Sequence, residues 1–263
     1  MPIQRCRHPI LSPIMTEKNI PLNERIIFAL DVASPDEALA LVEKLDSEIK
    51  FFKVGLQLFL AGWFHTVDAI IARGNKVMVD LKFFDIPETV KLAVDQLKDR
   101  GVSFATVHGN DPILRAAVQE KDSTMKILAV TVLTSFDEQD MRAMGMTGSI
   151  QDMVLHRARR ALEIGCDGVV SSALEAAPLR KYLGSNFLVV TPGIRPGANT
   201  DDGSDDQKRI ATAKQAVLNG ADHVVIGRPI RDSRDPVGLI RELHREIAQG
   251  LAENDKNRIR TDR

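Results

Sequence analysis

Short apolar runs alternate with helical patterns along most of the chain, and one unit returns several times. In each unit a helix ends at a glycine and a β-rich apolar run follows, as at Gly74 before residues 77–79 and at Gly220 before residues 224–226. Glycine readily closes a helix in the left-handed conformation, and continuously apolar runs are typical of parallel strands that are buried on both faces. The alternation therefore predicts an α/β fold.

Eight apolar runs fit this description, with helical patterns between them. They are residues 26–30, 51–54, 77–81, 102–107, 127–133, 168–171, 187–190 and 223–226. The helix between the first two runs is marked by Ser34 as its cap, Pro35 in its first turn and Glu37 as the second member of a capping box. No Gly-x-Gly-x-x-Gly follows the first run, as an open dinucleotide-binding sheet would require. The pattern therefore favours a closed (β/α)8 barrel, the TIM-barrel fold.

The length and charge of the chain agree with one such barrel. Its 263 residues are close to the roughly 250 that the fold needs. We expect an irregular N-terminal extension at 1–22, a catalytic domain at 23–251 and a charged, fraying C-terminal tail at 252–263. A net charge of −1 gives no reason to expect nucleic acid or a membrane as a partner. With no secretory core and no spanning apolar stretch, a cytoplasmic protein is expected.

Polar residues follow the predicted strands at their carboxyl ends, where the chemistry of these barrels takes place. Asp80 and Lys82 are two apart on the third strand, so their side chains share a face and would pair in the barrel mouth. Asp85 lies beyond the strand end, where a turn can redirect it or present it to a neighbouring subunit. An alternative is a buried salt bridge that only fixes the barrel rim. Further polar residues at strand ends are Asp31, Lys53, Thr134, Ser135, Arg195 and Arg228.

Two glycine and arginine motifs follow the last two strands, at residues 191–196 and 225–230. Barrels often bind phosphate there, because glycines let backbone amides approach an oxyanion and arginine offers a matching fork of donors. The motifs predict a phosphorylated small molecule as the ligand; turn glycines and solvated rim arginines are the alternative. The long segment 192–206 suits a lid over the phosphate, or an inert surface loop.

These residues closely resemble the orotidine 5′-monophosphate decarboxylase family in its bacterial form, from about residue 25 to residue 251. The resemblance rests on the runs 28–31, 52–55, 80–87, 130–135, 191–195 and 226–228. It implies a carboxy-lyase that converts orotidine 5′-monophosphate to UMP and carbon dioxide in de novo pyrimidine biosynthesis, without metal or cofactor.

The resemblance also implies roles for particular residues. Lys53, Asp80, Lys82 and Asp85 would form an alternating catalytic network in which Lys82 protonates pyrimidine carbon 6. Asp85 and Thr89 would serve the partner subunit's site in a homodimer. The remaining implied substrate contacts are Asp31 and Lys53 to the ribose hydroxyls, Thr134 in the pocket wall, Arg195, Gly227 and Arg228 to the phosphate, and Gln207 between phosphate and pyrimidine.

Two places depart from the family pattern. The loop from Arg195 to Gln207 is about three residues longer than expected, and residues 108–111 replace a more glycine-rich turn. We interpret His108 in that turn as a structural residue.

Two other functions fit parts of the pattern. Magnesium-dependent keto-sugar-phosphate decarboxylases and hexulose phosphate synthases of the same superfamily share the Asp-x-Lys-x-x-Asp motif, but place an acidic metal ligand on the second strand. This chain has Lys53 there, which would repel a divalent ion. A non-catalytic sensor of phosphorylated ligands would have no need of a lysine within a carboxylate network.

Overall fold

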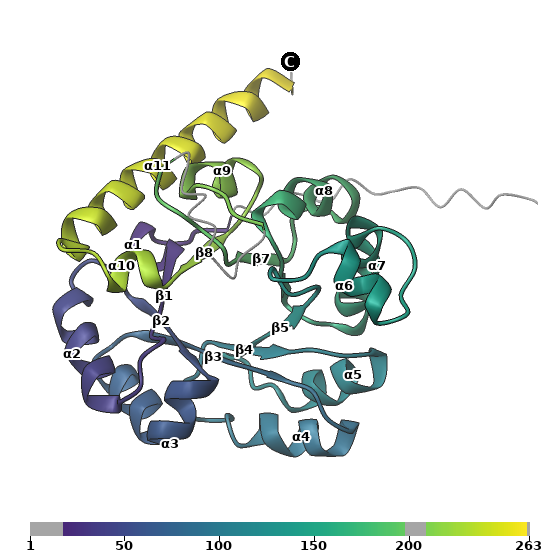
Figure 1. The fold of residues 1–263 in the computed structure, drawn as a ribbon, viewed down its shortest axis with the longest axis horizontal. Helices are drawn as coiled ribbons and strands as arrows, with labels where there is room; N and C mark the ends of the chain where they lie inside the picture. The colour runs from purple at the N-terminus through teal and green to yellow at the C-terminus, as the bar shows by residue number, and fades with distance from the viewer. Residues whose placement is uncertain (1–17, 198–208, 262–263) are drawn as a thin grey trace, which may run out of the picture.

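The computed structural model describes residues 18–197 and 209–261, which form a closed barrel of eight parallel strands ringed by helices (Figure 1). The strands follow one another around the barrel in chain order, and β1 pairs with both β2 and β8 to close it. Their bounds are β1 (Ile26–Ala29), β2 (Phe51–Gly55), β3 (Lys76–Phe83), β4 (Phe104–Val107), β5 (Lys126–Val130), β6 (Gly168–Val170), β7 (Leu188–Thr191) and β8 (His223–Ile226). The predicted TIM barrel is confirmed.

The helices lie outside the strands and cover them. They are α1 (Leu22–Arg25), α2 (Pro35–Leu45), α3 (Leu56–Ala72), α4 (Pro87–Asp95), α5 (Asp111–Glu120), α6 (Glu138–Ala143), α7 (Ile150–Ile164), α8 (Ala173–Leu183), α9 (Ala213–Leu218), α10 (Arg228–Arg231) and α11 (Pro236–Thr261). Ser34 caps α2 as predicted, because its Oγ accepts from the backbone N of Glu37 at 3.2 Å. That bond is one half of the expected capping box. Among the described helices, none is long and apolar enough to cross a membrane.

The barrel interior is closed at its amino-terminal end by aromatic side chains. The rings of Phe51 and Phe104 lie 4.7 Å apart, and both meet the imidazole of His223 edge to face. His223 is buried, and its Nδ1 hydrogen-bonds the carbonyl oxygen of Glu24 at 2.9 Å. Because aromatic rings fill this end, the cavity described below opens at the other end of the barrel, at the carboxyl ends of the strands.

The structure extends two elements beyond their predicted ends. Strand β3 continues to Phe83, with a register shift against β4 between Val79 and Phe83. Helix α11 continues to Thr261, into the segment expected to fray. No proline or glycine follows Gly250, and α11 is held to α9 by the ion pair of Lys214 with Glu253 at 2.6 Å. An uninterrupted helix-forming sequence with a tertiary anchor explains the longer helix.

Candidate active site

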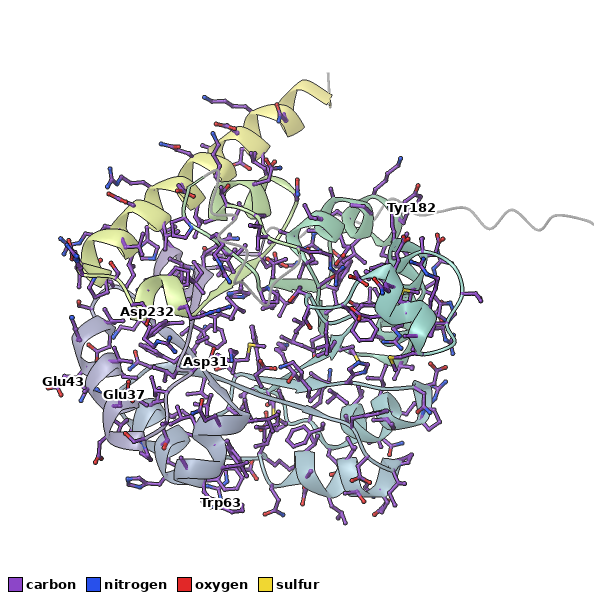
Figure 2. The ribbon with its side chains drawn as sticks, viewed as in Figure 1. Asp31, Glu37, Glu43, Trp63, Tyr182 and Asp232 are labelled. Atoms are coloured by element: carbon purple, nitrogen blue, oxygen red, sulfur yellow. The ribbon has the colours of Figure 1, made fainter. Side chains whose placement is uncertain are left out.

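A cavity of about 270 Å³ opens at the carboxyl ends of the strands. Its floor is apolar, with Met78, Val130, Val170 and Val225 from the barrel interior. Polar and charged side chains surround this floor, and Asp31 among them is labelled in Figure 2. The polar lining residues named from the sequence are Asp31, Lys53, Asp80, Lys82, Thr134, Ser135, Arg195 and Arg228. The structure therefore brings these predicted residues together in one cavity.

Four charged side chains from the segment after β1, from β2 and from β3 form a continuous row. Lys53 Nζ lies 3.1 Å from Asp31 Oδ1 and 3.5 Å from Asp80 Oδ2. Lys82 Nζ lies 3.0 Å from Asp80 Oδ1. The signs alternate along the row, so each lysine is next to at least one carboxylate. Lys53 and Asp80 are buried, while the side chain of Lys82 is 36% exposed and faces the open cavity.

Burial and pairing act in opposite directions on the two central groups. Burial alone lowers the pKa of Lys53, but the carboxylates of Asp80 and Asp31 outweigh it and raise that pKa above its ordinary value. Burial alone raises the pKa of Asp80, but the ammonium groups of Lys53 and Lys82 and a hydrogen bond from Thr106 lower it. Both groups are therefore ionised at neutral pH, and they fix a negative charge beside Lys82.

Thr106 on β4 completes this arrangement and was not singled out from the sequence. Its hydroxyl donates to Asp80 Oδ1 at 2.9 Å and accepts from the backbone N of Lys82 at 3.0 Å. Lys82 needs this support because its φ of 49° is in the left-handed region, where a side chain costs free energy. A single threonine inside the apolar run 104–107 was the available signal.

Asp85 and Thr89 lie outside the cavity of their own chain. Both are exposed, and Asp85 Oδ1 accepts from the backbone N of Ile86 at 2.7 Å. Large apolar side chains near them in the sequence are more than half exposed. Helix α3 also exposes large apolar side chains, among them Trp63, which is labelled in Figure 2. The exposed apolar residues of α3, the β3–α4 loop and α4 are Leu56, Leu60, Trp63, Phe84, Ile86 and Leu92, here named the apolar face.

The loops after β7 and β8 supply the other side of the cavity. Arg195 is fixed by its backbone N, which donates to the carbonyl oxygen of Ala211 at 2.9 Å. A Cβ at Gly227 would lie 3.3 Å from both Ala29 Cβ and Asp31 Oδ2, so this close approach favours glycine. Gln207 lies outside the described residues, as does most of the predicted lid at 192–206.

The row of charges leaves no position for a cation between its carboxylates. The ammonium of Lys53 already lies between Asp31 and Asp80, within 3.5 Å of each. Among the described residues, no three or more His, Cys, Asp or Glu side chains are grouped so that they could hold a metal ion. These residues do not fit a divalent metal site.

Comparisons of sequence and of structure with known proteins point to the same family. The family model described as "Orotidine 5'-phosphate decarboxylase / HUMPS family" matches residues 24–243. An orotidine 5′-phosphate decarboxylase of Methylococcus capsulatus is 54% identical over 84% of this chain and 91% of its own length. An orotidine 5′-phosphate decarboxylase of Nitrobacter winogradskyi is 46% identical over 87% of this chain and 94% of its own length. The crystal structure of the enzyme from Lactobacillus acidophilus superposes with a TM-score of 0.74 at 32% identity, covering 85% of this chain and 99% of that one.

Proposed function

The chain belongs to the orotidine 5′-phosphate decarboxylase / HUMPS family and is a carboxy-lyase of UMP biosynthesis, and we propose that the charged row around Asp80 carries out its reaction. The substrate is orotidine 5′-monophosphate, and the products are UMP and carbon dioxide. The observation that carries the mechanism is the pairing of Lys82 with a buried carboxylate at the edge of the cavity.

The reaction must stabilise an electron pair that the pyrimidine ring cannot delocalise. When the bond from carbon 6 to the carboxylate breaks, its electrons stay in an orbital in the plane of the ring. Enzymes lower such barriers by up to about 23 kcal/mol over the ordinary range, which needs several effects at once. Asp80 would lie near the substrate carboxylate and disfavour the ground state, while Lys82 would stabilise the developing negative charge. Lys82 then donates its Nζ proton to carbon 6, and solvent restores that proton.

Binding groups at both ends of the cavity would hold the nucleotide. We assign Asp31 and Lys53 to the ribose hydroxyls, and Thr134 to the wall of the pocket. Arg195, Gly227 and Arg228 would receive the phosphate, whose binding energy can assemble a dry, preorganised site. Gln207 and a lid at 192–206 belong to the same proposal.

The active enzyme in this proposal is a homodimer in which Asp85 and Thr89 serve the partner subunit's site. Two observations support it. Asp85 does not reach the charged row of its own chain, and the apolar face that flanks it exposes six large side chains. Large apolar side chains are usually buried, and their exposure on neighbouring elements suits a protein interface. A cytoplasmic location is part of the same proposal.

A magnesium-dependent activity of the HUMPS type is less well supported by the residues. It would need a metal between carboxylates that Lys53 already joins. We therefore propose that the reaction uses neither metal nor cofactor, with Lys82 supplying the positive charge.

The test is to follow the ultraviolet absorbance of orotidine 5′-monophosphate with purified protein in excess chelator. The wild type is expected to consume the substrate at an undiminished rate, whereas Lys82→Ala should lose activity because both its charge and its proton are removed. Absence of turnover by the wild type, with and without added magnesium, would refute the assignment. Turnover of orotidine 5′-monophosphate that requires magnesium would contradict the metal-independent mechanism.

A further inference from the structure

We infer that Arg209 is a positioning residue for substrate binding, a role that rests on the decarboxylase function above. Arg209 lies just before α9 and is absent from the cavity lining. Its guanidinium nevertheless joins the loop after β5 to the start of α8, and both of these segments meet the cavity wall.

The Arg209 guanidinium has two partners, and its ion pair is largely buried. Nη1 forms an ion pair with Oε1 of Glu175, and Nη2 donates to the carbonyl oxygen of Leu133 at 2.8 Å. The side chains of Arg209 and Glu175 are only 12% and 9% exposed. A buried charge without its partner is costly, since water cannot replace that partner. The pair therefore fixes the position of Leu133, which lines the cavity, relative to α8.

Glu175 extends this link into a second part of the cavity wall. Its Oε2 accepts from Ser171 Oγ at 2.7 Å and from the backbone N of Ser172 at 2.8 Å. Ser171 lines the cavity, and its hydroxyl also accepts from Thr131 Oγ1 at 3.2 Å. Both oxygens of the carboxylate are therefore occupied, and the direction of the Ser171 hydroxyl depends on Glu175.

The third wall is the segment that carries Arg195. Ala211 is two residues after Arg209, and its carbonyl oxygen accepts from the backbone N of Arg195 at 2.9 Å. The N of Ala211 donates in turn to the carbonyl oxygen of Gly193 at 3.2 Å. One buried ion pair thus sets the spacing of three loops that line the cavity, and a displacement of these loops would weaken the binding of substrate and product.

The test compares variants of the Arg209–Glu175 ion pair with one variant of a matched ion pair at the other end of the barrel. Arg209→Met removes the guanidinium, and Glu175→Gln removes the charge but keeps an oxygen for the cap of α8. The control is Arg180→Met. Arg180 pairs with Asp222 at 2.7 Å, with 18% and 11% exposure, beside the amino end of β8. For each protein we would measure kcat and KM for orotidine 5′-monophosphate, the inhibition constant of UMP and the thermal midpoint.

Arg209→Met and Glu175→Gln are expected to raise both KM and the UMP inhibition constant about tenfold, with kcat changed less than threefold. The double variant should be no worse than Arg209→Met, because no unpaired charge then stays buried. Arg180→Met should lower the thermal midpoint but leave KM and the inhibition constant within twofold of the wild type.

Constants for UMP and substrate that stay at wild-type values in Glu175→Gln would overturn the role of Arg209, even if Arg209→Met failed to fold. Equal increases in Arg180→Met would overturn it too, because the effect would then follow from general destabilisation. Turnover by the wild type in the same assay checks the decarboxylase function separately. Its absence would overturn both conclusions, whereas its presence with unchanged constants overturns only this one.

Discussion

Replacing Thr106 with valine tests how the charged row is held, because this change keeps the shape of a fully buried side chain and removes only its hydroxyl. Two hydrogen bonds are lost, one to Asp80 Oδ1 at 2.9 Å and one from the backbone N of Lys82 at 3.0 Å. A hydrogen bond to a charged group contributes about 1.5–3 kcal/mol, and an unpaired buried N–H costs about 1–3 kcal/mol.

Since the two terms partly overlap, we expect the free energy of unfolding to fall by about 2–4 kcal/mol. Because we propose that Asp80 and Lys82 act in the transition state, the loss of the carboxylate bond should lower kcat about tenfold to a hundredfold, at about 1.4 kcal/mol for each factor of ten. KM should change little, because Thr106 does not line the cavity. Urea unfolding and the ultraviolet decarboxylation assay measure the two effects.

Thr66 provides the matched control for this substitution. It is also fully buried, and its hydroxyl has no hydrogen-bond partner, so Thr66→Val should leave kcat unchanged and stability equal or higher. A Thr106→Val enzyme that keeps wild-type kcat would refute the reasoning. So would an equal loss of kcat in Thr66→Val.

Three other predictions concern the amino-terminal end of the barrel, phosphate binding and the dimer. Burial lowers the pKa of His223 to about 4, so only the unfolded chain binds this proton between pH 6.5 and 4; the free energy of unfolding should therefore decrease by about 3 kcal/mol as the pH is lowered across that window. Urea titrations of the wild type against His223→Asn check this, and parallel pH profiles would contradict it. Arg228→Ala should reduce kcat/KM about tenfold to a hundredfold by removing a charge-assisted phosphate bond, without unfolding the barrel; a normal kcat/KM in the decarboxylation assay counts against that role. Mixing inactive Lys82→Ala and Asp85→Ala subunits should restore activity in hybrids, each with one intact shared site, and no recovery despite demonstrated subunit exchange would indicate sites within one chain.

Much of the fold could be predicted because parallel barrel strands are buried on both faces. Each of the eight strands therefore contains a run of mainly apolar residues, and all eight predicted runs overlap an observed strand. The exact ends of the strands were harder to predict. Strand β3 continues through polar residues to Phe83, because its last residues are held by Thr106 and by β4 rather than by their own apolarity.

The candidate site was predictable to the extent that strand ends define the barrel mouth. Asp31, Lys53, Asp80 and Lys82 follow from that rule and are in contact. Two features of the site were not predicted from the sequence. The left-handed backbone of Lys82 breaks the simple alternation from which its pairing was argued, and the contact of Arg209 with residues 34 and 76 positions away leaves no local sequence signal.

The most direct measurement of the central claim follows the hydrogen on carbon 6 of UMP in D2O by nuclear magnetic resonance. If Lys82 delivers a proton to carbon 6, the same group must remove it in the reverse direction. The wild type is therefore predicted to replace this hydrogen with deuterium, while Lys82→Ala, saturated with UMP, should not. Exchange by Lys82→Ala at the wild-type rate would contradict the account, because another group would then be the proton donor.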